Sequence, residues 1–397
     1  MPPVPSPSCN TASPALPARA GLSRLLMSLG YHAAMPAADH PSAIDWLATD
    51  PAQVALRFRA RQAMVAADLF MPADARLRDD DRVAIAGLLT TLVGQVEADL
   101  RMRLAGAAAA AAPLLAHALA TPDPAIAGSV AEQAGARGDS ALVAVLAQRA
   151  AERRLVARLR RDRDRDAAIG QAPPVPTTLL ATDTDPAIAP AARALAAIDP
   201  VGDGLPAAGA AMLPAEVQHR LVWRVAATLR AQAIARHGLA GIDIDPLIAH
   251  AAGAALAGYD EGVTPAGLAL ALARAVAAAG RLDGGLAVSA IAAGEAGFAA
   301  ALLAVAGGVG FAAAWEMMLD PDPTRLLLLC RAADFPAVAA ADIVQRLAAG
   351  ADDEGLAGRL DSYDAITPRR AAAAISLWRL DPAYLEAIAE IAARPQP

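Results

Sequence analysis

The sequence has no lysine and few of the residues that build disulfide-bonded, metal-binding or β-rich proteins. It contains 397 residues, of which 2 are cysteines and 3% are aromatic. Cys9 and Cys330 are too few for a disulfide framework or a zinc site. Every basic residue is arginine, which codon usage explains more simply than function does, because few surface positions require arginine in particular. The low cysteine content favours a reducing compartment, and we expect a cytoplasmic protein.

Motifs that mark an active site are also missing from the sequence. The chain has no G-x-S-x-G elbow, Walker A loop, H-E-x-x-H pair or Cys-x-x-Cys pair. Histidines are scattered over separate predicted helices, at positions 32, 40, 117, 219, 237 and 250. We therefore expect no metal, no cofactor and no catalytic residue, and the chain is predicted to be non-enzymatic.

The charge balance bears on the class of partner. The net charge is −7, and the residues after position 211 carry most of it. A general nucleic-acid binder is expected to have a basic surface, which this balance does not supply. A protein partner is therefore favoured over nucleic acid.

Alanine, in contrast, is abundant within a hydrophobic fraction of 56%. Because alanine is the best helix former and a poor strand residue, the composition predicts an all-α fold. In the clearest helix, from residue 81 to 104, apolar residues recur every three or four positions, at Ile85, Leu88, Leu89, Leu92, Val96, Leu100 and Leu104. Arg82, Glu97 and Arg101 are expected elsewhere on the surface of this helix.

Asp-Pro and Thr-Pro pairs divide the chain into short helices. The Asp or Thr side chain accepts a free helix N–H, and proline occupies the first helical position. These pairs begin at Asp50, Asp123, Asp185, Asp245, Thr264, Asp322, Thr367 and Asp381. Glycines at 106, 135, 170, 238, 258, 280 and 350 are expected to end the intervening helices. The pattern predicts stacked helix pairs of the HEAT type. Successive Asp-Pro pairs are about 60 to 75 residues apart rather than about 40, so the predicted α-solenoid is degenerate.

Three regions are predicted along the chain. Residues 1–43 form a disordered tail with a short amphipathic helix, whose apolar face contains Leu22, Leu25, Leu26 and Leu29. A Pro- and Gly-rich stretch, residues 199–214, marks the main boundary. Residues 44–200 and residues 201–397 are therefore expected to be two helical-repeat domains.

The stretch from Leu302 to Met318 reads LLAVAGGVGFAAAWEMM and has three interpretations. Gly308, Gly310 and Ala313 satisfy the G-x-G-x-x-A fingerprint of a dinucleotide-binding loop, although that fingerprint requires a preceding strand. The charge-free window Ala296–Trp315 has the length of a membrane span, although its glycines, alanines and acidic flanks argue against one.

We favour the third interpretation, in which two buried helices meet at a glycine corner. The first is expected near residues 298–306 and the second at 311–319, followed by another helix that contains residues 326–330. Tryptophan residues are predicted to be core anchors at all four positions, Trp46, Trp223, Trp315 and Trp378.

The most conspicuous charged run is RRLVARLRRDRDRD, residues 153–166. In a helix, four arginines form one stripe: Arg154, Arg158, Arg161 and Arg165. Such a stripe is a candidate partner-binding site, because arginine pairs with phosphate and carboxylate groups. The favoured alternative is a solvated face in which Asp162 pairs with Arg158 and Asp164 with Arg160.

Three segments carry a resemblance to a known family. They are Arg59 to Ala105, Leu328 to Pro336 (LLCRAADFP) and Ser362 to Leu380 (SYDAITPRRAAAAISLWRL). Together they resemble the bacterial family known as domain of unknown function 2336. The resemblance implies an all-helical, HEAT-like and cytoplasmic protein, and it implies no activity.

Three hypotheses of function follow from the sequence. The preferred one is a non-enzymatic cytoplasmic scaffold or regulator, built of helical repeats, that binds a protein partner. The alternative is a nucleic-acid-associated helical-repeat protein that uses the stripe of Arg154, Arg158, Arg161 and Arg165. The least favoured is a dinucleotide-binding enzyme centred on Gly308 and Gly310.

Overall fold

The computed structural model describes residues 79–109, 116–117, 125–136, 139–171, 173–198, 213–320, 322–347, 359–381, 384–385, 387–388 and 391. The chain divides into two compact units, residues 1–42 and 43–397, and every described residue belongs to the second. The residues predicted to form the tail and its leucine helix, and Trp46, lie outside the described residues.

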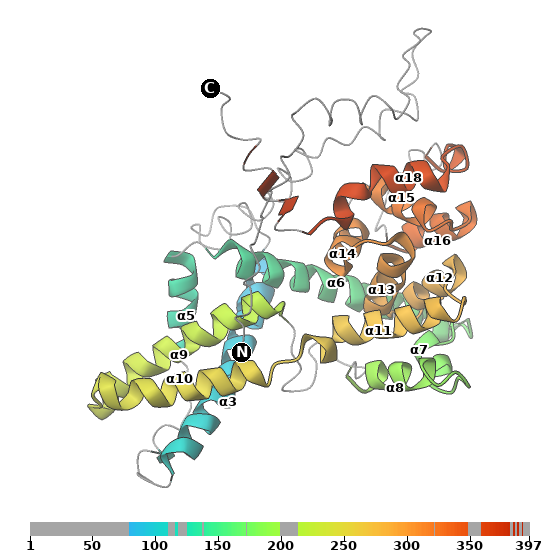
Figure 1. The fold of residues 1–397 in the computed structure, drawn as a ribbon. Helices are drawn as coiled ribbons and strands as arrows, with labels where there is room; N and C mark the ends of the chain where they lie inside the picture. The colour runs from blue at the N-terminus through green and yellow to red at the C-terminus, as the bar shows by residue number, and fades with distance from the viewer. Residues whose placement is uncertain are drawn as a thin grey trace, which may run out of the picture. The chain divides into compact units, whose positions relative to one another are not determined.

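The described part of the chain is helical and contains no strand, which confirms the predicted all-α class (Figure 1). Its first half contains α3 (Asp79–Ala108), α5 (Ala125–Ala136), α6 (Ser140–Ala168), α7 (Pro176–Leu180), α8 (Ile188–Ile198), α9 (Ala215–His237) and α10 (Gly241–Ala257). Its second half contains the 3₁₀ turn η2 (Glu261–Val263), α11 (Pro265–Ala278), α12 (Gly284–Ala292), α13 (Ala296–Gly307), α14 (Phe311–Leu319), α15 (Thr324–Ala332), α16 (Ala337–Leu347), α18 (Pro368–Ala374) and the 3₁₀ turn η3 (Ser376–Arg379).

The first of two buried clusters, here called the first core, lies between long helices. It joins α3, α5, α9, α10 and the first half of α6. The apolar face predicted for residues 81–104 is confirmed, since all seven of its members are buried in this core. Glu97 and Arg101, which we expected on the surface, are only 6% exposed.

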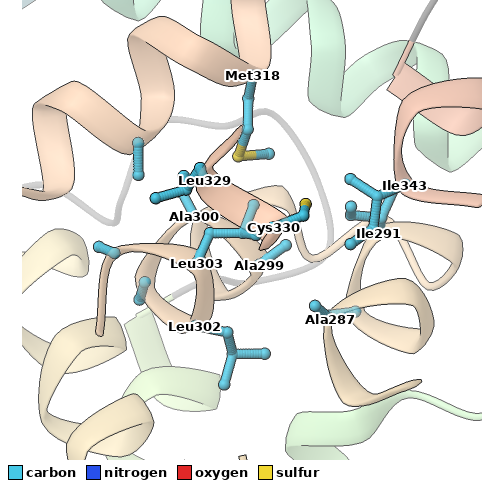
Figure 2. Close-up of a cluster of buried hydrophobic side chains, with 14 of the residues drawn as sticks. Ala287, Ile291, Ala299, Ala300, Leu302, Leu303, Met318, Leu329, Cys330 and Ile343 are labelled. Atoms are coloured by element: carbon cyan, nitrogen blue, oxygen red, sulfur yellow. The ribbon is translucent and has the colours of Figure 1, made fainter. Parts of the chain in front are cut away.

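The second core is built from shorter helices. It contains the second half of α6 together with α7, α8 and the helices from α11 to α18. Figure 2 shows how alanines such as Ala299 and Ala300 alternate with larger side chains such as Leu303, Leu329 and Cys330. Small and large side chains fill each other's gaps in this way, as dense packing requires.

Helix α6 contributes to both cores. Leu142 and Leu146 on its first half belong to the first core, whereas Leu155 and Leu159 belong to the second. The chain crosses between the cores again, because α7 and α8 pack in the second core and α9 and α10 in the first. The two cores therefore do not divide at residues 200 and 201, and the expected domain boundary there stays a prediction.

Helix stacking in the second core is only partly regular. Helices α8, α11, α13, α15 and α18 contact one another in succession, as the stacked layer of a helical repeat does. Helix α12, however, packs against α16. In a regular solenoid each repeat contacts its immediate neighbour. The contact between α12 and α16 departs from that order, and the structure establishes the fold as all-helical only.

Several predicted helix starts are confirmed by their caps. The hydroxyl of Thr264 accepts the N–H of Gly267 at 2.9 Å, and that of Thr367 accepts the N–H of Arg370 at 3.3 Å. Asp185 accepts the N–H of Ile188 at 3.3 Å, at the start of α8. Asp50 and Asp123 lie outside the described residues.

Other predicted helix boundaries were wrong. Asp245 does not start a helix, because α10 already begins at Gly241 and contains Pro246; its carboxylate pairs with Arg230 instead. Gly106 and Gly135 lie inside α3 and α5 rather than after them. Glycine at 170, 238 and 280 does follow a helix with positive φ, as predicted.

The glycine corner has the favoured form. Helix α13 ends at Gly307, Gly308 has a φ of 67°, and α14 begins at Phe311. The two helices are bent by 114°, and the Trp315 side chain is buried in the second core as predicted. The dinucleotide-binding interpretation of Gly308 and Gly310 is wrong, because a helix precedes the glycines where the fingerprint requires a strand. Residues 326–330 are also helical, within α15.

Candidate functional site

The arginine stripe predicted on α6 is largely engaged by the protein itself. Arg158 donates to the main-chain oxygens of Arg346, at 3.0 Å, and Leu347, at 2.7 Å, near the end of α16. Arg161 donates to Ala157 O at 3.2 Å, and Arg165 pairs with Asp162 at 3.1 Å. The expected pair between Asp162 and Arg158 is therefore wrong.

This geometry weakens the stripe as a phosphate site. Arg154 and Arg161 have exposed side chains, but Arg158, between them, is held against α16. An arginine that already donates to main-chain carbonyls has fewer donors left for a phosphate. The stripe serves at least in part to fasten α6 to α16.

Histidine and tryptophan do not form a site in the described part of the chain. No group of three metal-binding side chains occurs there. The Trp223 indole N–H donates to Nε2 of His219 at 3.2 Å on the outer face of α9. Trp223 is 39% exposed, so its predicted role as a core anchor was wrong, whereas Trp378 is buried in the second core.

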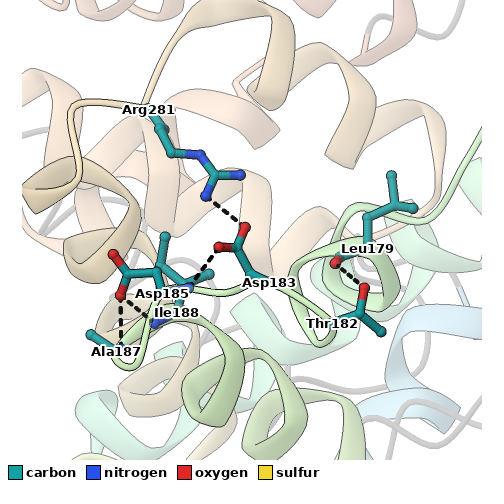
Figure 3. A network of polar contacts seen from close by, with 7 residues as sticks. All are labelled: Leu179, Thr182, Asp183, Asp185, Ala187, Ile188 and Arg281. Carbon is teal, nitrogen blue, oxygen red and sulfur yellow. Dashed lines mark hydrogen bonds and ion pairs between the residues drawn. The ribbon is translucent and has the colours of Figure 1, made fainter.

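One polar network ties the start of α8 to the end of α11 (Figure 3). Asp183 accepts the N–H of Asp185 at 3.0 Å and an Arg281 N–H at 2.6 Å. The N–H of Asp185, followed by Arg281, holds the pKa of the Asp183 carboxyl below its ordinary value. Each drawn group is bonded to another, so this network acts as a clamp between two loops.

A second network joins two of the segments that carry the family resemblance. Arg331 donates to Ile366 O at 2.5 Å and lies 5.5 Å from the centre of the Tyr363 ring. Tyr363 in turn donates to Phe335 O at 2.9 Å. These bonds fix α15 against the turn before α18, which gives the conspicuous residues of both segments a role in the fold.

Asp334 stands out within this second network. Its φ is 56°, and it is the one described residue other than glycine with a positive φ. Its carboxylate pairs with Arg331 at 3.1 Å. The position ends α15, where glycine is the usual residue, and the ion pair offsets part of the backbone cost.

The feature without such an internal explanation is the outward face of α3. Every fourth residue from 86 to 106 is exposed and uncharged, and together these six form the α3 ridge: Ala86, Thr90, Gly94, Ala98, Met102 and Gly106. Val83 and Met102, towards its two ends, are 71% and 65% exposed. Residues four apart form the ridges by which helices pack against each other. Because each step of four residues turns about 40° around the axis, the ridge winds around α3 rather than lying on a single face, and no described residue covers it.

The threonine hydroxyls on and beside the α3 ridge form hydrogen bonds within the helix, so the ridge is effectively apolar. The Thr90 hydroxyl donates to Ala86 O at 2.9 Å, and the neighbouring Thr91 hydroxyl donates to Gly87 O at 2.9 Å. Because both donors are satisfied within the helix, the threonines do not require a polar partner.

The glycines of α3 are unexplained by the packing of the described residues. A Cβ added at Gly87, Gly94 or Gly106 would meet nothing within 4 Å. Glycine inside a helix costs about 1 kcal/mol relative to alanine. Gly128 in α5 and Gly253 in α10 are open in the same way, so open helix glycines do not by themselves mark a contact surface, and those of α3 count only together with the exposed ridge.

A buried charged pair lies on the flank of α3 that meets α9, and the sequence did not reveal its burial. Arg101 Nε lies 2.6 Å from Glu97 Oε1, and Arg101 also donates to Gln232 of α9 at 3.1 Å. This pair fixes α3 against α9, and so sets which face of α3 points outward. A Glu-Arg pair at positions i and i+4 is common on exposed helices. The sequence alone therefore does not distinguish this buried pair from a surface pair.

Helix α3 is also the one described helix long and apolar enough, from Arg82 to Ala108, to cross a membrane by length and composition. Of its most apolar window, 39% is buried. The window we considered in the sequence, Ala296–Trp315, instead forms the bent pair α13 and α14. We did not single out the exposed surface of α3 in the sequence, because its exposed residues are mostly alanine, glycine and threonine rather than leucine.

Comparison with known proteins finds one family that part of the chain resembles. Residues 209–376 match the family described as "Uncharacterised protein conserved in bacteria (DUF2336)", which confirms the predicted resemblance over those residues. The matched part covers α9 to α18 but not α3. No curated protein and no solved structure matches the chain.

Proposed function

We propose that this protein, of which residues 209–376 match the DUF2336 family, is a non-enzymatic interaction protein that binds a protein partner through the α3 ridge. The single observation that carries the proposal is the exposed, uncharged ridge from Ala86 to Gly106, with Val83 also exposed on the same helix. Exposed apolar patches of this kind are typical of interaction sites.

The polar clusters support a binding role rather than a catalytic one. The partners of Arg158, Arg331 and Arg281 are main-chain oxygens or carboxylates that fasten one helix or loop to another. A catalytic constellation instead requires polar groups that converge on a space for substrate. The described networks have the arrangement of structural clamps.

The finer description of the scaffold is a degenerate HEAT-like repeat. Successive contacts from α8 through α11 and α13 to α15 support it, and the return of α16 to α12 is the departure from regularity. Stacked helices present extended surfaces for partners. We place the protein in the cytoplasm, which Cys330, a buried free thiol, suits.

A site-specific photo-crosslink in the native cells tests the proposed function. A photoreactive amino acid replaces Ala98 on the α3 ridge or, as the matched control, Ala231, which is an exposed alanine on α9. We expect a protein adduct from position 98 and none from position 231. If position 98 gives no protein adduct, or both positions give the same adducts, the α3 ridge is not the binding surface.

A further inference from the structure

We infer that the middle of α6, residues 148–155, is a pH-sensitive joint between the two cores, closed when the carboxyl of Glu152 is protonated and looser when it is ionised. The inference does not depend on the α3 ridge or on its partner. It follows from the way the helices of the two cores meet, from the burial of Glu152 and from a second crossing of the chain at the same place.

Helix α6 is the element that connects the two cores. Among the described helices, all the extensive contacts lie within one core or involve α6. Helix α3 packs against α6 from the first core, whereas α12, α13 and α14 pack against it from the second. Two compact bodies that share one helix in this way can shift about it, as in hinge and shear motions.

Glu152 lies where α6 passes from one core to the other. Ala150 belongs to the first core and Leu155 to the second. Glu152, between them, is 6% exposed. Its carboxylate accepts hydrogen bonds from Gln148 at 2.9 Å and from Arg149 at 2.7 Å. A buried carboxylate is costly unless its partners compensate fully for the lost water, so a charge on Glu152 favours any separation of the cores that hydrates it.

The second described crossing of the chain meets α6 at the same place. Tyr259 lies between α10 of the first core and η2, which packs against α11 of the second. Its hydroxyl donates to the main-chain oxygen of Leu213 in the first core. Burial, followed by the Glu261 carboxylate, raises the pKa of Tyr259 to about 12, and Arg149 acts in the opposite direction. The Arg149 guanidinium is therefore close to both crossings.

The direction of the pH response follows from the pKa of Glu152. Burial raises this pKa above its ordinary value of 4.5, and Arg149 and Gln148 offset the effect only in part. Among the described residues, Arg149 is the charged group that acts on this carboxyl. The closed joint holds the proton more tightly than an opened, hydrated joint does. The closed joint is therefore favoured at low pH, and this preference is lost as pH rises through the raised pKa.

Distances between spin labels on the two cores test the joint in the full-length chain. With Cys9→Ser, the labels replace two exposed residues, Ala231 on α9 and Gln345 on α16. Cys330 is fully buried and stays unlabelled. In a series from about pH 4.5 to about pH 8, we expect a narrow distance distribution at the acidic end. At the basic end the share of other distances is expected to rise at least about threefold, since one pKa unit is a tenfold change in an equilibrium.

A label pair within one core is the control for effects of pH on the labels themselves. Ala271 on α11 is exposed, and α11 and α16 both belong to the second core. Labels at Ala271 and Gln345 are expected to give the same distribution at every pH. One unchanged distribution for the pair at Ala231 and Gln345, or an equal change in both pairs, would overturn the joint.

Glu152→Gln separates this carboxyl from every other titrating group. Glutamine keeps the size of the side chain and resembles its neutral form, so the variant is expected to keep the narrow distribution across the series. The matched control is Glu132→Gln, which removes an exposed carboxyl on α5 and should respond to pH as the natural chain does. A response that survives Glu152→Gln would overturn the role of Glu152.

Hydrogen exchange in the natural chain tests the same joint without labels or substitutions. After correction for the intrinsic effect of pH on exchange, amides at residues 148–155 and 258–261 are expected to lose protection as pH rises. Amides of α13, inside the second core, are expected to keep it. Equal changes at the joint and in α13 would contradict the inference, because pH would then act on the whole fold.

Discussion

Gly94 in α3 and Gly307 in α13 differ in what surrounds the missing side chain. A Cβ at Gly307 would lie 2.1 Å from Leu329 Cδ1, whereas a Cβ at Gly94 would meet nothing within 4 Å. The second core uses its glycines to pack its own short helices closely. In the first core, Gly94 leaves a flat surface on the outside of a long helix. The same residue type therefore indicates internal packing in one region and an external contact in the other.

The two regions also differ in where their charges lie. Four charged side chains of the first region are at most 8% exposed: Glu97, Arg101, Glu152 and Asp139, the residue before α6. In the second core, arginines such as Arg331 and Arg379 donate to main-chain oxygens at its edge. The fold of the first region thus depends on buried ionic groups, and that of the second on packing.

Breaking the buried pair in α3 is expected to have the largest effect. Arg101→Met leaves the Glu97 carboxylate buried without its arginine, and we expect the free energy of unfolding to fall by about 3 kcal/mol or more. Urea denaturation at pH 7 measures the change. The control is Arg103→Met, which removes a half-exposed pair with Asp99 one half-turn away and is expected to cost less than about 1 kcal/mol. Equal losses from both variants would contradict the importance of burial.

Filling a packed glycine of the second core comes next. A Cβ at Gly267 would lie 2.5 Å from the main-chain oxygen of Gly262, and backbone cannot move aside as a flexible side chain can. Gly267→Ala is expected to lower the free energy of unfolding by about 2 kcal/mol. Gly253→Ala, at an exposed position of α10 with open space, is the control and is expected to raise it. Thermal denaturation measures both changes. Stabilisation by both substitutions would contradict the distinction between packed and open glycines.

Glu152 tests the buried charge of α6 through pH. Burial, only partly offset by Arg149, raises the pKa of this carboxyl above its ordinary value of 4.5. The folded state therefore holds the proton more tightly than the unfolded state does. This contribution to stability is fully present below pH 4.5 and is lost as pH rises through the folded pKa.

Glu152→Gln removes that titration. The variant is expected to gain stability relative to the natural chain between pH 4.5 and pH 7, as measured by urea denaturation across that range. A constant difference between the two proteins at all pH values would show that Glu152 titrates alike in both states.

The sequence predicted much of the second core because its signals are local. Thr264 and Thr367 cap helices, and the glycine corner separates α13 from α14, through bonds between residues close together in the chain. The burial of Trp315 followed from the apolar helix around it. Asp245 was misassigned because an Asp-Pro pair has the same local form inside the first turns of a helix as at its start.

The candidate site was not predictable in the same way. The exposure of the α3 ridge depends on α9 and α10 covering the other sides of the helix, and the sequence contains no local sign of those contacts. Glu97 and Arg101 have the spacing of a surface pair, and only the approach of Gln232 from α9 buries them. Arg158 was likewise assigned to solvent because its acceptors lie nearly 190 residues away in the chain.

The smallest expected change in stability tests the central claim most directly. Gly94→Ala adds a methyl group to the α3 ridge, where the chain itself leaves open space. If Gly94 is present for contact with a protein partner, the substitution should stabilise the protein by about 0.5 to 1 kcal/mol and reduce the photo-crosslink at position 98. Urea denaturation measures the stability, and the yield of the adduct in the native cells measures the contact. A more stable protein that gives less adduct is the predicted result; a less stable protein, or an unchanged yield, would contradict the account.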